Sequence, residues 1–371
     1  MSLRVFLYVT FRDDCMFSDV PEHQEMQPMQ PIALEFKADS WIYFRLWITN
    51  LWLIVITLGL CFPWAKARKI KFFHENTWLH DSHFVSTINP RSMFKGFLLV
   101  NFIVLMIGLV VVLLPAETRS DQFKMQLLSV SLFLLVFPWF YHRGLRYRLH
   151  NTSYRGVRFS SNVSLKTCYQ VFCFWAMTSF VFFFYPLSFA RFRELQLKYT
   201  RFGSTSFSLE SNLGTLYKIF FKAFALGVVA MLVLIALFVS SAVTGSLSPI
   251  LIGAGVVSFS VLTQWAICYW RANANNLMLS TVGIGPHLYL QSKLTTKELF
   301  KLYVTNTILI VLTLGLFIPF ASIRLAKYKA NSLVVWCPSP DFLKVLSGAQ
   351  VKQDSAIGEP LVDDFSFDFS G

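Results

Sequence analysis

Charged residues are scarce in this chain. Only 14% of its 371 residues are Asp, Glu, Lys or Arg, whereas an ordinary soluble domain has about 25%. A helix of about 20 apolar residues is enough to cross the hydrocarbon core of a bilayer. The shortage of charge therefore excludes a water-soluble globular protein and indicates a multi-pass membrane protein. Stretches without any charged residue are 46–65, 96–116, 167–190, 223–270 and 302–323.

Motifs of common enzymes and metal sites are also missing. The sequence contains no GxSxG, Walker loop, GxGxxG or HExxH, and its six cysteines form no CxxC pair. His74, His80 and His83 lie close together but lack the spacing of a metal site. No Asp or Glu lies inside an apolar segment, which argues against ion-coupled transport. The sequence predicts a protein that is not an enzyme and that holds no metal and no cofactor.

Hydropathy divides the remaining sequence into about seven apolar segments. We therefore expect an all-α integral membrane protein, a repeat-built bundle of these segments with small β-hairpin arms on the cytoplasmic side. The block 223–270 would be about 72 Å long as one helix, too long for a bilayer core of about 30 Å, so it must turn near 244–249. The transmembrane domain is expected over 34–335, between a polar preamble (1–33) and a polar, acidic tail (336–371). The segments are 41–63, 94–115, 125–142, 168–190, 219–241, 249–270 and 298–320.

Most positive charge flanks the apolar segments. The net charge is +13, and 25 of the 33 Lys and Arg, against 5 acidic residues, lie in five basic arms. Basic loops next to apolar segments mark the cytoplasmic side of a membrane. This distribution predicts membrane lipids, and not nucleic acid, as partners. The arms are 66–95, 143–166, 191–222, 271–301 and 324–329.

The first and last apolar segments repeat one pattern. FRLWITNLWLIVITLGLCFPWAKAR (44–68) and FKLYVTNTILIVLTLGLFIPFASIR (300–324) share 14 of 25 residues without a gap. An amide inside an apolar segment needs hydrogen-bond partners. The matched polar residues are therefore candidates either for a substrate site, as in repeat-built transporters, or for fixed packing of the two segments. They are Asn50 with Asn306 and Thr57 with Thr313.

The basic arms share a second pattern, in which Pro, Arg, Thr and Phe recur at fixed spacing. Complete copies begin at Pro63, Pro138 and Pro186, and Arg271 and Arg324 open incomplete ones. Pro and Arg are expected to end each apolar helix at the membrane interface, where Arg meets the negative end of the helix dipole. The exit arginines are candidates for a ring that binds lipid headgroups or anions, with plain anchoring as the alternative. They are Arg68, Arg143, Arg191, Arg271 and Arg324.

After each exit we expect a β-hairpin and then a capped helix. Turn-forming pairs such as His80–Asp81 and Arg155–Gly156 separate short β-tolerant runs. Asn89, Ser164 and Asn212 follow as N-cap residues, and Thr295 with Glu298 has the form of a capping box.

Two topologies are compatible with these patterns. Seven plain spans would place the third and fourth arms outside, against the charge rule. Alternatively, 41–63, 168–190 and 298–320 are re-entrant or interfacial, and only the hairpins 94–142 and 219–270 cross the membrane. The run Thr57-Leu-Gly59…Pro63 offers a place to break the first of these segments.

The same residues resemble a known family. The runs YFRLWITN and TLGLxxPWAKAR and the arm NTW…HF are similar to the YjgN-like family of bacterial inner-membrane proteins over about 34–335. The resemblance implies a multi-pass protein of the bacterial inner membrane whose molecular function is not established. Phe36-Lys37-Ala38 stands where the family has Phe-x-Gly.

Two functional hypotheses follow. In the first, the protein conducts a small solute or handles lipid at the interface between the repeats. In the second, it is a structural or interaction protein whose basic arms bind anionic lipid or a cytoplasmic partner. A polar cavity between 44–68 and 300–324 would favour transport, and an aromatic, dry contact there would favour the structural role. The substrate and the oligomeric state stay open.

Overall fold

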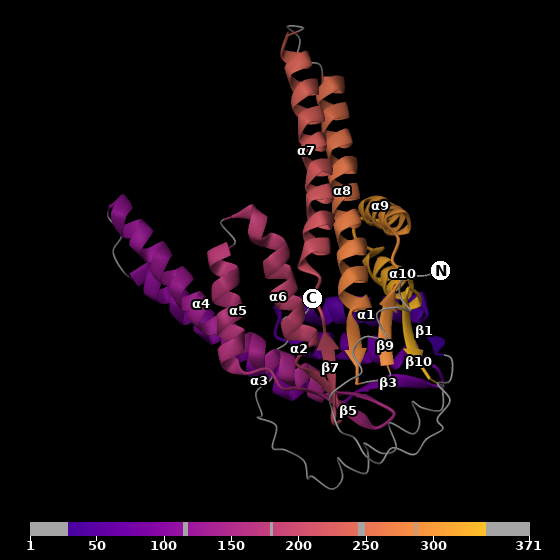
Figure 1. Ribbon diagram of the computed structural model, residues 1–371. Coiled ribbons are helices and arrows are strands. Elements are labelled where there is room, and N and C mark those ends of the chain that lie inside the picture. The colour runs from indigo at the N-terminus through magenta and orange to yellow at the C-terminus, as the bar shows by residue number, and fades with distance from the viewer. Residues whose placement is uncertain (1–28, 114–117, 179–180, 244–248, 286–287, 339–371) are drawn as a thin grey trace, which may run out of the picture.

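The computed structural model describes residues 29–113, 118–178, 181–243, 249–285 and 288–338 (Figure 1). Most of the predicted preamble (1–33) and most of the predicted tail (336–371) lie outside these ranges, but residues 30–33 belong to the first strand. Along the chain, pairs of helices alternate with pairs of short strands. The helices are α1 (Ser40–Ile56), α2 (Phe62–Glu75), α3 (Pro90–Leu113), α4 (Arg119–His150), α5 (Leu165–Thr178), η2 (Phe182–Phe184), α6 (Tyr185–Leu197), α7 (Leu213–Val243), α8 (Pro249–Ser280), α9 (Thr296–Leu312) and α10 (Ile318–Asn331). The strands are β1 (Gln30–Phe36), β2 (Thr77–Leu79), β3 (Ser82–Ser86), β4 (Thr152–Tyr154), β5 (Val157–Ser161), β6 (Thr200–Phe202), β7 (Thr205–Leu209), β8 (Val282–Ile284), β9 (Leu288–Ser292) and β10 (Leu333–Cys337).

The strands form one closed antiparallel barrel, so the expectation of an all-α bundle is wrong. The order around the barrel is β1-β10-β9-β8-β7-β6-β5-β4-β3-β2. β1 closes it by pairing with β10 on one side, Gln30 opposite Cys337, and with β2 on the other, Leu34 opposite Leu79. An isolated two-stranded hairpin leaves both edges unpaired and is marginally stable. Pairing edge to edge removes every free edge, and this pairing joins hairpins that are far apart in the sequence.

Apolar side chains fill the barrel. Val157 is 0% exposed, and Tyr154, Phe202 and Leu288 are buried in the same cluster. The recurring phenylalanines of the arms, Phe84, Phe159 and Phe207, pack against this cluster. The recurring Phe of the arms therefore has the same role in each hairpin, which is to pack against the barrel core. This part of the barrel is a packed core and not an open channel.

The hairpin turns agree with the sequence prediction. His80 and Arg155 have positive φ angles of 53° and 49°, and Gly156 follows at 81°. Turns of this hand match the twist of the strands that they join. The predicted caps also form: backbone N–H groups of Arg91, Thr167 and Thr215 donate to the side chains of Asn89, Ser164 and Asn212. The predicted capping box does not form. The Thr295 hydroxyl lies 3.3 Å from Tyr328 Oη and makes no hydrogen bond to a backbone N–H of the first helical turn.

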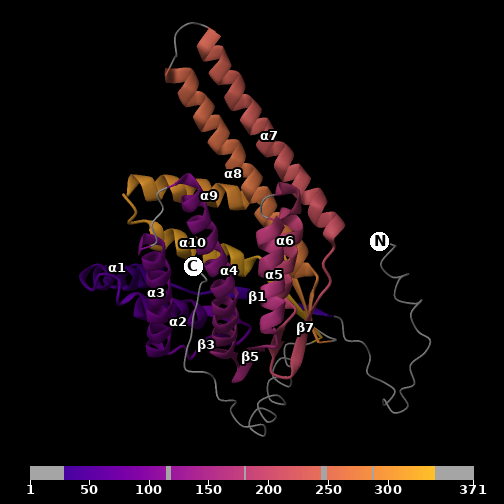
Figure 2. The ribbon, with the colours of Figure 1, turned by 90° about the vertical axis from the view of Figure 1, so that its left-hand side faces the viewer.

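Four helices of the described ranges are long and apolar enough to cross a membrane: α3, α4, α7 and α8. They form two hairpins that diverge from one side of the barrel (Figures 1 and 2). The predicted turn of 223–270 falls between α7 and α8, and residues 244–248 lie outside the described ranges. The prediction of about seven membrane-crossing segments is therefore wrong.

The segments 41–63, 168–190 and 298–320 each break into two short helices instead of forming one span. Pro63, Pro186 and Pro319 occupy the first turn of α2, α6 and α10, where proline needs no hydrogen-bond donor. Arg68, Arg191 and Arg324 consequently lie inside these second helices. Arg143 and Arg271 lie inside α4 and α8, so the predicted place of the exit arginines at a C-terminal helix end is wrong. All hairpins share one barrel and hence one side of the membrane, which favours the topology with two membrane-crossing hairpins.

Candidate functional site: an apolar cleft and a basic cavity

The matched asparagines are the partners of the matched arginines. Arg68 Nη1 donates to Asn50 Oδ1 at 3.2 Å, and Arg324 Nη1 donates to Asn306 Oδ1 at 2.8 Å. Both asparagines are 7% exposed. Each bond ties the first helix of a short helical pair to the second, and satisfies an amide that would be costly to bury alone. This geometry favours packing over a substrate site.

Thr57 and Thr313 build the turn between the two helices of each pair. Thr57 Oγ1 accepts from the backbone N–H of Cys61 at 3.1 Å, and Thr313 Oγ1 accepts from that of Phe317 at 3.0 Å. Gly59 and Gly315 follow with φ angles of 89° and 94°, which only glycine adopts without strain. The adjoining Leu58 and Leu314 are 93% and 95% exposed at the tips. These threonines therefore have a structural role.

The exit arginines have different partners. Arg191 pairs with Glu194 at 3.1 Å, Arg143 lies 4.9 Å from the Trp139 ring, and Arg271 Nη1 donates to Tyr303 Oη at 3.0 Å. In the fourth arm, the residue nine positions before the first strand residue is Asn273, whereas in the others it is the arginine. Arg271 is thus two residues out of register and serves a different contact. A ring of exit arginines that binds lipid headgroups or anions stays a prediction.

The first and last helical pairs meet through aromatic rings. The Phe44 ring stacks on Phe320 with centroids 5.3 Å apart, and Phe320 in turn stacks on Phe317 at 5.5 Å. Trp41 lies 6.2 Å from the Phe320 ring, and Tyr43 and Ile323 are buried at the same contact. This is the aromatic contact that the sequence analysis associates with a structural role.

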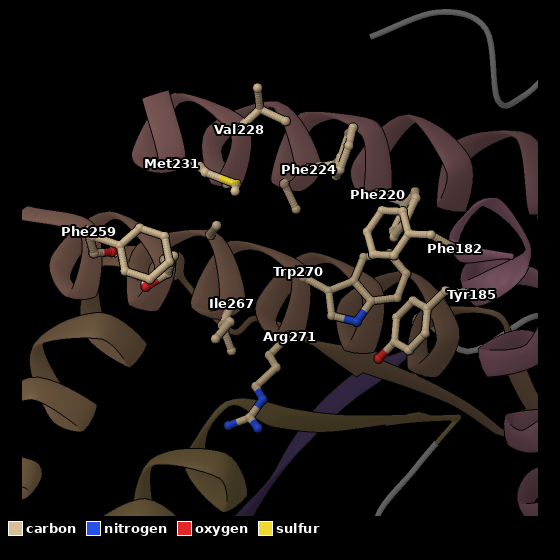
Figure 3. A pocket seen from close by; sticks show the side chains of 14 residues that line it. Phe182, Tyr185, Phe220, Phe224, Val228, Met231, Phe259, Ile267, Trp270 and Arg271 are labelled. Carbon is tan, nitrogen blue, oxygen red and sulfur yellow. Dashed lines mark hydrogen bonds between the residues drawn. The ribbon is translucent and has the colours of Figure 1, made fainter. Parts of the chain in front are cut away.

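A large apolar cleft opens between α7, α8 and the start of α6 (Figure 3). It has a volume of about 610 Å³, within the range of small-molecule sites. Aromatic rings gather at its end nearest the barrel. The ring centroid of Phe182 lies 4.9 Å from those of Phe220 and Phe224, and that of Tyr185 lies 5.6 Å from that of Trp270. The Thr263 hydroxyl donates to its own helix backbone and so adds little polarity.

Arg271 is the one charged residue among those that line the described cleft. It lies one residue from Trp270 at the barrel end, and its guanidinium points away from the aromatic rings (Figure 3). The opposite end is lined by Phe259, Val228 and Met231. The cleft is therefore apolar over most of its length, with one positively charged residue at its barrel end.

A second cavity, the basic cavity, lies between the barrel rim and the helices α2, α6, α8 and α10. Its volume is about 360 Å³. Arg193 and Lys329 supply its charge, and its other polar lining residues are Thr77, Asn275 and Ser292. Burial lowers the pKa of Lys329, and the neighbouring positive charges of Arg271 and Arg193 lower it further. Burial also lowers the pKa of Arg193.

The sequence analysis did not predict the apolar cleft or the basic cavity. Their lining residues come from different arms, and nothing in the local pattern distinguishes Lys329, which lines the basic cavity, from Lys327, which does not. Only the packing of α6, α8 and α10 on the barrel brings Arg193, Asn275 and Lys329 together.

The model of a bacterial family described as "Bacterial protein of unknown function (DUF898)" matches residues 31–364. The chain belongs to this family. The chain is similar to the inner membrane protein YjgN of Escherichia coli K12, with 27% identity over 163 residues. The aligned residues cover 44% of this chain and 35% of the relative. YjgN of Escherichia coli O157:H7 is 28% identical over 41% of this chain and 34% of the relative, and that of Salmonella typhimurium LT2 is 25% identical over 36% and 32%.

The resemblance to YjgN-like proteins is thereby confirmed. These names, with four helices long and apolar enough to cross a membrane, also confirm the predicted location in the inner membrane. The aligned part spans about a third of the length of these relatives. No solved structure matches the chain.

The packing role of the Asn–Arg pairs gives a testable prediction. Asn306→Leu and Arg324→Met should each lower the free energy of unfolding by about 1–3 kcal/mol. The double variant should lose less stability than the sum of the two single losses, with a coupling energy of about 1 kcal/mol. The reason is that either single change already breaks the hydrogen bond between the two side chains. A double-mutant cycle from thermal unfolding measures this, with Asn50→Leu and Arg68→Met as the matched pair. Additive losses in both cycles would contradict the pairing.

Proposed function

We propose that this member of the DUF898 family handles lipid: it binds an anionic membrane lipid in the cleft of α7, α8 and α6. The observation that carries the proposal is the amphipathic cleft itself, which is apolar beside a membrane-crossing hairpin and positive at its barrel end. An acyl chain fits the apolar part. The headgroup would lie near Trp270 and Arg271, at the depth where aromatic and basic residues meet lipid headgroups.

Conduction of a solute has less support. The barrel interior is packed with apolar side chains, and the contact between α1 and α10 is aromatic. A structural role for that contact is a second candidate, in which the basic arms hold anionic lipid or a cytoplasmic partner. The absence of enzymatic activity stays a prediction.

Filling the cleft tests the proposal. Gly227 lines it, and a Cβ at this position meets nothing within 4 Å, so Gly227→Leu should fold normally. Each buried methylene contributes about 0.8 kcal/mol, and a leucine that excludes two or three of them should weaken lipid binding by roughly tenfold to fiftyfold. Native mass spectrometry of the full chain with phosphatidylglycerol measures the bound fraction.

Gly108→Leu is the matched control, because a Cβ at Gly108 on α3 also meets nothing within 4 Å, and the residue does not line the cleft. It should bind lipid like the unchanged protein. Equal binding by both variants, or equal loss in both, would contradict a lipid site in the cleft.

A further inference from the structure

The geometry points to the basic cavity as a binding site for a phosphate group. This site is separate from the apolar cleft and does not depend on it. The cavity is large enough for a phosphate with part of the molecule that carries it, at about 360 Å³. Its cations come from two arms of the chain, Arg193 on α6 and Lys329 on α10, and they face a common space above the barrel rim.

The positive charge of the cavity is uncompensated. No Asp or Glu is among its described lining residues. Within the described part of the chain, neither Lys329 nor Arg193 forms an ion pair, and Glu194, next to Arg193 in sequence, pairs instead with Arg191. Arg193 is half-buried, whereas Lys329 is exposed. Because both line one cavity, the two cations repel each other, and burial costs Arg193 part of its hydration. An anion in the cavity would relieve both costs.

The donors are also held in place. Arg193 Nη2 donates to Asn275 Oδ1, and Nη1 lies 3.4 Å from Gln196 Oε1. Asn275 Nδ2 donates to the backbone carbonyl of Arg271 at 2.6 Å, which fixes the amide oxygen toward Arg193. A guanidinium has five N–H donors, so it keeps donors for a ligand after these bonds. A fixed guanidinium with a nearby ammonium suits the several acceptor oxygens of a phosphate.

Two sources can supply this chemistry. A phospholipid headgroup would reach the cavity from the membrane interface, and a free phosphate or small phosphorylated solute would reach it from the cytoplasm. Both present the same oxygens to Arg193 and Lys329. The experiment therefore uses one probe of each kind.

The test is made on the full chain, purified in detergent and freed of lipid. Inorganic phosphate is titrated at constant ionic strength against chloride, and binding is followed by the shift in thermal unfolding and by 31P line broadening. Saturable binding of phosphate, beyond the effect of chloride, is expected. Short-chain phosphatidylglycerol, followed by the same signals, is the second probe.

Lys329→Gln should weaken binding of the successful probe by about tenfold or more, because it removes a charge-assisted donor. The same change should not lower the unfolding temperature, since it also removes a repulsion. Lys327→Gln, two residues away on α10 and not among the residues that line the cavity, alters the net charge equally and should bind like the unchanged protein. Lys329→Arg should retain most of the binding.

Binding of phosphate alone would identify a soluble anion as the ligand. Binding of phosphatidylglycerol alone that Lys329→Gln weakens and Gly227→Leu leaves in part would identify a headgroup in this cavity. Failure of both probes, an equal response to chloride, or equal loss in Lys329→Gln and Lys327→Gln would overturn the inference. Gly227→Leu separates the two sites: it should leave phosphate binding unchanged, so a failure of the lipid proposal does not decide this one.

Discussion

Ile32→Asp is expected to abolish the folded protein. Ile32 is 7% exposed and belongs to the apolar cluster inside the barrel. A carboxylate there would lose the packing of the isoleucine and would be buried without a partner, at a combined cost of roughly 5 kcal/mol or more. That cost is comparable to the total stability of an ordinary domain, about 5–15 kcal/mol. The effect should be large because β1 joins β10 to β2 and so closes the barrel.

Size-exclusion chromatography of the detergent-solubilised protein measures the loss, as disappearance of the monodisperse peak. The adjacent residue supplies the control. Ala33 faces outward on the same strand and is exposed, so Ala33→Asp should keep the peak and an unfolding temperature close to that of the unchanged protein. If the two variants behaved alike, β1 would not be a wall of a closed apolar barrel.

Sided labelling should give an all-or-none result for topology. Cysteines at Asp81, Ser161 and Ser204 lie on three different hairpins of the barrel, and all should react with an impermeant maleimide only from the cytoplasmic side. A cysteine at Thr118, which precedes α4 at the far end of the α3–α4 hairpin, should react only from the periplasmic side. The reason is that one closed barrel cannot lie on both sides of a membrane.

The background for this labelling needs few changes. Cys168, Cys268 and Cys337 are buried and can stay, whereas Cys15, Cys61 and Cys173 are replaced by Ser. Reaction of Ser204→Cys from the periplasm would mean that α5 and α6 together cross the membrane and that β6 and β7 leave the barrel. The seven-span topology would then return.

The two matched helical pairs show which features a local sequence pattern can predict and which it cannot. The sequence predicted that Asn50 and Asn306 need partners, because an amide in an apolar segment is costly. It did not predict that Arg68 and Arg324 are those partners. The helix had been expected to end near each arginine, and the turn at Gly59 and Gly315 instead folds a second helix back against the first.

The sequence by itself determined the membrane location, the hairpin turns and the N-caps at Asn89, Ser164 and Asn212. These features depend on charge-free length and on hydrogen bonds between residues a few positions apart, so a local pattern is enough to predict them. Only the tertiary structure decided the closed barrel, the break of three apolar segments into helical pairs, and the two hollows. Those depend on contacts such as β1 with β10, or Arg193 with Asn275, between residues that are distant in the chain and that carry no local signal of each other.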